Sequence, residues 1–456
     1  MCRILFILLV CCLPIGLWAD EYYCFRVYLK DKGNAGYRVE NPEVYLSKRA
    51  IERRIKQAIE VTQEDFPISQ AYINQLSKTG AKPIVQSRWF ATVVMESTDS
   101  LVAKQLEQLD IVDSVKYVWK GKRENLERVE ETGKLYPEKE PLPDKYGHAQ
   151  KQIKMLNGMK LHKAGFQGEG MQVAVIDAGF KHVDRIAAFD SLHLLGTYNF
   201  VTPGESVFLD DDHGTKVLSC LSAYLPGIMV GTAPNASFLL LKSEDGASEY
   251  PIEEDYWTAA VEYADSVGVD VVTSSLGYFS FDDESLSYGY EALTGKHALI
   301  SQAANRASEK GILVFCSAGN EGGNEWRKIT VPADAIGAFT VGSITQEKKR
   351  SNFSSMGFTA DRRVKPDAVA LGTSSCVIGS RGDVRFASGT SFSTPILAGL
   401  GICLWQSLPG LTNREVMDLL RRSSHLYKRP NVELGYGIPN VYKAYKKGKK
   451  YESRSK

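Results

Sequence analysis

VAVIDAGF, residues 173–180, sets four apolar residues directly before an aspartate and a glycine turn. An unbroken apolar run of this kind is typical of a β-strand that is covered on both faces. Similar runs follow at 238–241, 269–272, 312–315 and 339–341. Helical apolar spacings lie between them, at 257–264 and 300–307. The alternation predicts an α/β unit with a doubly wound parallel sheet over residues 146–445, and a site beyond the carboxyl ends of the strands.

Two further segments are expected before this unit. Residues 20–120 interleave strand-like and helix-like patterns, which predicts a small N-terminal α+β domain. The strand patterns lie at 22–30, 89–95 and 111–119, and the helical ones at 45–57, 68–78 and 99–109. Residues 121–145 carry many charges and several prolines without apolar periodicity. We expect this stretch to be an exposed linker that is open to proteolysis.

The N-terminus has the pattern of a secretory signal peptide. Arg3 precedes an apolar run at 4–15, and Ala19 is followed by acidic residues. A membrane anchor is the alternative, but the run is shorter than the ~20 apolar residues that a spanning helix needs. We expect residues 1–19 to be removed and the product to be secreted or periplasmic, without a membrane partner after that cleavage.

The charge balance excludes partners that bind through bulk electrostatics. The chain has 55 Lys and Arg against 54 Asp and Glu, a formal charge of +1, so we expect no nucleic-acid partner. A basic tail at 446–456 leaves a nucleic-acid or lipid contact open, although a frayed, solvated tail is the favoured interpretation.

The cysteines predict neither a disulfide framework nor a metal site. Five of them lie outside the signal peptide, without any Cys-x-x-Cys spacing: Cys24, Cys220, Cys316, Cys376 and Cys403. Buried thiols are the favoured interpretation, with a disulfide pair left open. The run at 210–212 is either a solvated acidic turn or a cation site, the turn being favoured. We expect no catalytic metal, and structural calcium stays open.

Three polar residues lie at the ends of the expected elements, each close to a glycine. Asp177 ends the first strand, His213 opens a helical pattern, and Ser391 lies in SGTSFSTP, residues 388–395, ahead of a helix of small residues. Each alone is explained by a turn or a helix cap. Together they supply nucleophilic catalysis, because a serine hydroxyl needs a base to remove its proton and a carboxylate to orient that base.

With one further motif, these residues resemble the subtilisin-like serine proteases, peptidase family S8. The resemblance rests on Asp177 in VAVIDAGF, His213 in HGT, Asn320 in SAGNEGG and Ser391 in GTSFSTP. The chain order Asp, His, Ser is that of subtilisin. The likeness covers about residues 146–445. It implies a serine endopeptidase that hydrolyses peptide bonds through an acyl-enzyme intermediate and requires no cofactor for catalysis.

The resemblance also implies a role for each residue. Ser391 would be the nucleophile, His213 the general base and then acid, and Asp177 the carboxylate that orients His213. Asn320 would donate a hydrogen bond to the oxyanion together with the Ser391 amide. The residues implied in binding the polypeptide substrate are Ser275, Leu276 and Gly277 on one strand, and Ser317, Ala318 and Gly319 on the facing wall. Their small side chains predict a roomy primary pocket for a large apolar or aromatic residue.

The N-terminal domain resembles the propeptide of these enzymes more weakly. This implies a zymogen whose own propeptide is its inhibitor, with autocleavage within 134–145. A catalytically idle peptide-binding protein with the same fold is the alternative, and an esterase is less favoured because the Gly-x-Ser-x-Gly motif is absent here.

Two features depart from the usual pattern. The segment 278–296 is longer than in relatives, as a surface insertion or, less favoured, as a source of substrate contacts. The acidic residues Glu249, Glu253, Glu254 and Asp255 suggest a preference for basic substrates.

Overall fold

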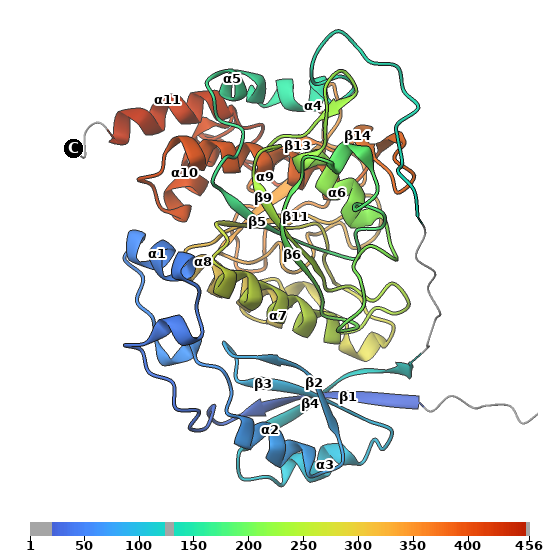
Figure 1. The fold of residues 1–456 in the computed structure, drawn as a ribbon, viewed down its shortest axis with the longest axis vertical. Coiled ribbons are helices and arrows are strands. Elements are labelled where there is room, and N and C mark those ends of the chain that lie inside the picture. Colours follow the sequence, from blue (N-terminus) through green and yellow to red (C-terminus); the bar gives the residue numbers. More distant parts are fainter. Residues whose placement is uncertain (1–20, 124–131, 453–456) are drawn as a thin grey trace, which may run out of the picture.

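The computed structural model describes residues 21–123 and 132–452. The signal peptide expected at 1–19 lies outside these residues. Figure 1 shows a small N-terminal unit packed below helix α7 (Ile252–Val267) and a larger unit above, which contains the main sheet. The N-terminal unit ends with β4 (Val112–Lys122), and α4 (Gln150–Met155) is the first helix of the larger one.

The larger unit is built on a seven-stranded sheet whose neighbouring strands are all parallel. In spatial order the strands are β13 (Ala368–Leu371), β12 (Ala338–Ile344), β11 (Leu313–Ser317), β10 (Val271–Ser274), β5 (Gln172–Asp177), β9 (Ser237–Lys242) and β6 (His193–Asn199). The predicted doubly wound parallel sheet is thereby confirmed. β9 and β10 flank β5 on opposite sides, so the strand order reverses at β5. A crevice at the carboxyl end of β5 follows from this reversal.

Helices cover both faces of this sheet. α7 and α8 (Leu299–Glu309) lie on one face, and α6 (His213–Ser222) and α9 (Thr390–Ser407) on the other. Alternate residues of β5 divide between the two cores, Val175 packing with α6 and α9 and Ile176 with α7 and α8. Burial on both faces explains why the strands read as unbroken apolar runs.

The N-terminal unit is a four-stranded antiparallel sheet with two helices on its outer face. Its strands, in spatial order, are β2 (Lys82–Ser87), β3 (Thr92–Ser97), β1 (Glu21–Leu29) and β4. α2 (Gln70–Ser77) and α3 (Val102–Glu107) pack on one face through Leu76 and Leu106. The other face packs Cys24, Val94 and Val118 against the start of α7. The predicted α+β domain is therefore present, with β2 as an additional strand.

The remaining elements complete the layers. They are α1 (Lys48–Lys56), α5 (Gly158–Lys163), α10 (Asn413–Ser423) and α11 (Val441–Glu452), with the strand pairs β7 (Tyr224–Leu225) and β8 (Met229–Val230), and β14 (Ser375–Ile378) and β15 (Val384–Ala387). Within residues 21–123 and 132–452, none of the helices has the length and hydropathy needed to cross a bilayer.

The expectation of a frayed tail at 446–456 is wrong as far as residue 452, because helix α11 extends to that point. Val441 and Ala444 are buried against the core. Gly448 lies so close to Leu408 that an added Cβ would fall 2.2 Å from its Cδ1 atom. Apolar packing on one face therefore keeps the basic segment helical, and residues 453–456 lie outside the described part.

The linker expected at 121–145 stays a prediction, and its residues 124–131 lie outside the described part. Residues 132–145 are mostly exposed, although the backbone of Leu135 pairs with that of Ile186. Autocleavage in this stretch stays a prediction. The five cysteines that the structure describes are free thiols, and all of them are buried.

Candidate active site

The polar residues singled out in the sequence come together where β5, β10 and β11 end. Asp177 is the last residue of β5, and His213 and Ser391 lie in the first turns of α6 and α9. Ser275 directly follows β10, and Asn320 lies three residues beyond β11. Parallel strands bring their carboxyl ends to one edge of a sheet, so the topology assembles the site from segments far apart in sequence.

Asp177 and His213 form a direct contact. His213 Nδ1 donates to Asp177 Oδ1 across 2.6 Å, and the Ala178 amide donates to the same oxygen across 2.9 Å. Asp177 is only 1% exposed, so this hydrogen bond is shielded from water. The arrangement fixes the imidazole with Nε2 as its free nitrogen, which is the form a general base requires.

The charge around His213 is strongly negative. Burial alone lowers the pKa of His213, but the carboxylates of Asp177, Asp211 and Glu244 outweigh it and raise that pKa to about 9. Asp211 also accepts the His213 backbone amide at 2.7 Å, which holds the start of α6 in place. The imidazolium is thus favoured in this site until a proton acceptor or a higher pH removes its proton.

The Ser391 hydroxyl lies in the same cavity as His213 but donates to another acceptor. Its Oγ donates to the Ser275 carbonyl oxygen at 3.1 Å, while Ser275 Oγ donates to the Ser391 carbonyl oxygen at 2.9 Å. A hydrogen bond from Ser391 to His213 needs a rotation of this side chain. Such bonds are often long or misaligned before substrate binds.

Asn320 is oriented by its neighbour Thr390. Asn320 Oδ1 accepts hydrogen bonds from the Thr390 amide at 2.9 Å and from its hydroxyl at 3.0 Å. These two bonds use the carbonyl oxygen and leave the Nδ2 hydrogens for a ligand. The backbone amide of Ser391 and the N-terminus of α9 add further positive potential beside the Asn320 side chain.

These groups line a cavity of about 380 Å³, which we name the central cavity. Of the residues expected to bind substrate, five line it: Ser275, Leu276, Gly277, Ser317 and Gly319. Ala318 does not, because its side chain is fully buried in the core against α7 and α8. Gly319 has φ of +99°, a conformation that favours glycine, so the wall needs a residue without Cβ there.

Sequence reasoning missed Glu244, which lines the central cavity and lies two residues after β9. Its carboxylate accepts a hydrogen bond from the Tyr278 hydroxyl. Tyr278 is 1% exposed and belongs to the 278–296 segment, so this part of the segment is packed rather than superficial. The position of Glu244 after a buried strand, like that of Asp177, was the signal available in the sequence.

The four acidic residues noted in the sequence divide into two pairs. Glu254 accepts from the Tyr288 hydroxyl and from the Ile300 amide, and Asp255 forms a buried ion pair with Arg26 at 2.6 Å. These two carboxylates therefore bind partners within the protein. Glu249 and Glu253 instead line a cavity.

The described residues contain no group of three or more His, Cys, Asp or Glu side chains arranged to hold a metal ion. In the 210–212 turn, Asp210 pairs with Lys242 at 2.6 Å and Asp212 with Lys216 at 2.5 Å. These lysines neutralise the two carboxylates, which supports the interpretation as a turn.

The fold and the site define a hydrolase with a serine nucleophile, and comparison with known proteins agrees. Residues 168–438 match the Subtilase family, Peptidase S8, and residues 24–133 match the Peptidase S8 propeptide domain of Bacteroidota. The chain belongs to the subtilase family. It is a serine-type endopeptidase of the zymogen type, with an N-terminal propeptide domain.

Two curated proteases each match 64% of this chain. Subtilisin NAT of Bacillus subtilis subsp. natto is 29% identical over 297 residues, which cover 64% of this chain and 70% of that protein. The thermostable alkaline protease of Halalkalibacterium halodurans is 25% identical over 293 residues, or 64% of this chain and 72% of that protein.

Solved structures share the fold. The epidermin leader peptide processing serine protease of Staphylococcus aureus aligns with 93% of this chain and 99% of that chain, at a TM-score of 0.64 and 16% identity. MycP1 from the ESX-1 type VII secretion system aligns with 69% of this chain and 93% of that chain, at a TM-score of 0.52 and 22% identity.

Proposed function

We propose that the protein is a secreted or periplasmic endopeptidase in which Asp177, His213 and Ser391 form the catalytic triad. The observation that carries this assignment is the 2.6 Å bond between Asp177 and His213 beside a serine and an oriented amide in one cavity. The N-terminal signal pattern supports export.

The proposed reaction uses only groups of the chain and one water molecule. The Ser391 hydroxyl rotates toward His213 Nε2, which takes its proton as Oγ attacks the substrate carbonyl carbon. Asn320 Nδ2 and the Ser391 amide donate to the oxyanion. His213 then protonates the leaving amine, and water hydrolyses the acyl-enzyme by the same steps in reverse. No cofactor takes part in these steps.

The test of this function is cleavage of an unfolded protein by the processed form of the enzyme. We expect internal peptide fragments from reduced, carboxymethylated lysozyme, and inhibition by phenylmethylsulfonyl fluoride. Binding of the unfolded protein without any cleavage would support the idle peptide-binding alternative instead.

Removal of the Asn320 amide is expected to slow turnover strongly. Asn320→Ala should lower kcat by about 10² to 10³, the loss that follows removal of the corresponding donor in subtilisin. KM should change little, because the oxyanion exists only in the transition state. The control is Asn324→Ala, which removes an exposed asparagine outside the central cavity. A loss in KM rather than kcat would contradict the assignment.

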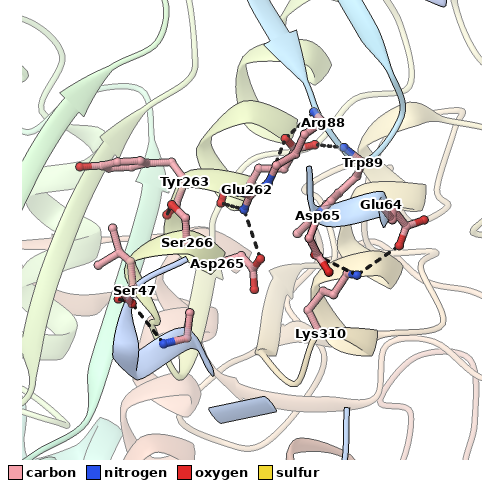
Figure 2. A network of polar contacts seen from close by, with 12 residues as sticks. Ser47, Glu64, Asp65, Arg88, Trp89, Glu262, Tyr263, Asp265, Ser266 and Lys310 are labelled. Carbon is pink, nitrogen blue, oxygen red and sulfur yellow. Dashed lines mark hydrogen bonds and ion pairs between the residues drawn. The ribbon is translucent and has the colours of Figure 1, made fainter. Parts of the chain in front are cut away.

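The proposed inhibitor, the propeptide, contacts the larger unit through buried polar groups (Figure 2). The Glu262 carboxylate on α7 accepts the backbone amides of Arg88 at 2.8 Å and Trp89 at 3.1 Å. The Trp89 side chain joins the core that α7 and α8 form with the sheet. These contacts support a propeptide that binds in one defined orientation on α7 and α8.

A second contact comes from α1, which packs against α7 and lies apart from the propeptide sheet (Figure 1). Arg53 and Arg54 on α1 both pair with Asp265 at the end of α7, and the guanidinium groups are at most 3% exposed. Arg53 also donates to the carbonyl oxygen of Val269 at 2.6 Å. Loss of Arg53 would therefore remove one of the three guanidinium groups that pair with Asp265, while Arg54 and Arg88 remain.

We expect Arg53→Ala to weaken inhibition by the propeptide added in trans by about 10- to 100-fold. Asp265 keeps Arg54 and Arg88, so the loss is that of hydrogen bonds to a charged group, about 1.5 to 3 kcal/mol, and 1.4 kcal/mol is tenfold in affinity. The measurement is the inhibition constant against processed enzyme. Lys48→Ala is the matched control on α1, because its side chain is 91% exposed. Equal inhibition constants for the two variants would contradict the proposed contact.

A further inference from the structure

A second cavity adjoins the central cavity. It has a volume of about 330 Å³ and shares Ala178, Glu244 and Glu249 with the central cavity. We name it the acidic cavity, because five carboxylates line it: Glu244, Asp245, Glu249, Glu253 and Asp282. Within the described part of the chain, no lysine, arginine or histidine lines it. Asp282 comes from the 278–296 segment, and its carboxylate accepts the Glu249 amide at 3.1 Å.

Among the described residues no cationic side chain lines this cavity, and the counter-charge that acts on Glu244 is His213 in the central cavity. None of the ion pairs between residues of 21–123 and 132–452 involves any of the five carboxylates. Placing several carboxylates in one partly closed site is unfavourable unless a cation compensates them. An arrangement of this kind stabilises a positively charged ligand.

Glu253 gives independent evidence for a ligand. Its residue is 1% exposed, and its Oε1 accepts the Asp245 amide at 2.6 Å. Its Oε2 is buried and has no hydrogen-bond partner among the described residues. A buried carboxylate oxygen without a partner at the wall of a cavity is a vacant acceptor for a donor that enters it.

The pKa values of three of these carboxyl groups are raised, as expected for acidic groups that are buried close to one another. Burial and the neighbouring Glu249 raise the pKa of Glu244 to about 8, although the Tyr278 hydroxyl opposes the shift. Burial and Asp282 raise the pKa of Glu249 to about 7, and burial with Glu244 and Glu249 raises that of Glu253 well above its ordinary value. A bound cation favours the ionised carboxylates and lowers these pKa values, so the affinity for a basic side chain should rise as the pH rises through them.

The geometry of an extended peptide indicates which substrate residue reaches the acidic cavity. Successive side chains of an extended peptide point to opposite sides. If one side chain occupies the pocket walled by Ser317 and Gly319, the side chain before it points to the other side of the cleft. The acidic cavity is lined by neither Ser317 nor Gly319, so it lies at a different part of the cleft from that wall. We call Glu244 and Glu249, the two carboxylates that line both cavities, its entrance.

We propose that the acidic cavity is the subsite for a basic side chain of the substrate, directly before the residue in the primary pocket. This inference rests on the proposed peptidase function. Arginine fits better than lysine, because its planar guanidinium can donate to two carboxylates at the entrance and to Glu253 Oε2 beyond them. The enzyme thus selects peptides with a basic residue followed by a large apolar one.

The experiment compares peptide p-nitroanilides that differ only at this position, Ala-Ala-Arg-Phe and Ala-Ala-Gln-Phe, with processed enzyme. We expect kcat/KM to be about 10- to 100-fold higher for the arginine peptide, the range given by hydrogen bonds to a charged group. Glu244→Gln should lower the ratio of the arginine value to the glutamine value about tenfold, whatever the loss of its charge does to His213 on both peptides. Glu249→Gln provides a second variant of the same entrance if Glu244→Gln does not self-process.

Glu284→Gln is the matched control. It removes the same charge from the exposed part of the 278–296 segment and lines neither cavity, so the ratio between the peptides should stay that of the wild type. Equal kcat/KM for both peptides would overturn the subsite while leaving the peptidase function intact. An equal loss on both peptides in Glu244→Gln and Glu249→Gln would also overturn it. Failure to cleave either peptide would remove the peptidase function, and the subsite with it.

Discussion

Ser391→Ala is expected to abolish proteolysis. In subtilisin the loss of the nucleophilic serine lowers kcat by about 2 × 10⁶, and the same loss is expected here. Without the Ser391 Oγ atom the proposed acyl-enzyme cannot form. The measurement is kcat on a peptide p-nitroanilide, using protein from which the propeptide has been removed.

The same variant tests self-processing. We expect wild-type protein to appear as a precursor and a shorter mature form, cut within 134–145, and Ser391→Ala to appear as the precursor alone. Ser393→Ala is the control, since Ser393 lies on the same helix, is fully buried and does not line the central cavity. Persistence of the short form in Ser391→Ala would show that another protease makes the cut.

Asp177→Asn is expected to lower kcat by about 10⁴, because an amide in place of the carboxylate favours the wrong tautomer of the base. It should also shift the pH profile. In the wild type, kcat/KM should rise with pH toward about 9, since the negative neighbours raise the pKa of His213 to that value and only neutral imidazole accepts a proton. Without the Asp177 charge that pKa falls, so the residual activity should reach its plateau at lower pH.

The control for this change is Asp211→Asn. It removes a more weakly acting charge and keeps an oxygen that can accept the His213 amide. We expect a small downward shift of the profile and a loss in kcat of less than tenfold. A profile that does not move in Asp177→Asn would mean that His213 is not the group whose ionisation limits the reaction.

The central site could be predicted from sequence because its signals are local. Each of Asp177, His213, Asn320 and Ser391 lies in a short glycine-containing motif at the end of a strand or the start of a helix. The order of the motifs along the chain was sufficient to identify the family. The orientation of Ser391 toward the Ser275 carbonyl could not be predicted, because it depends on a side-chain torsion.

Two of the strands that were missed, β6 and β2, have weak patterns, whereas β13 was missed although its sequence AVAL is apolar and fully buried. β6 lies at the edge of the main sheet and is mostly exposed, so its sequence HLLGTYN carries no core signal. β2 is also an edge strand and contains Pro83, a residue that lowers any expectation of a strand. The buried strands β5, β9, β10 and β11 were predicted within two residues of their observed ends, and β12 extends three residues beyond the predicted run, to Ile344.

Long-range charge pairing was beyond sequence reasoning. Arg53 and Arg54 lie in the helical pattern at 45–57, whose sequence does not show that both are buried against Asp265, more than 200 residues further along the chain. The acidic residues at the start of α7 also differ in their partners, which the sequence does not show. The propeptide pairs with Asp255, while Glu253 remains at the wall of a cavity, and only the fold distinguishes the two.

The most direct test of the account is to locate the residue that a fluorophosphonate modifies. Processed wild-type protein is treated with the probe, digested, and analysed by peptide mass spectrometry. We predict a single adduct on Ser391, lost in Ser391→Ala and formed far more slowly in Asp177→Asn. An unmodified Ser391 in protein that still cleaves peptides, or an adduct on another serine, would contradict the proposed triad.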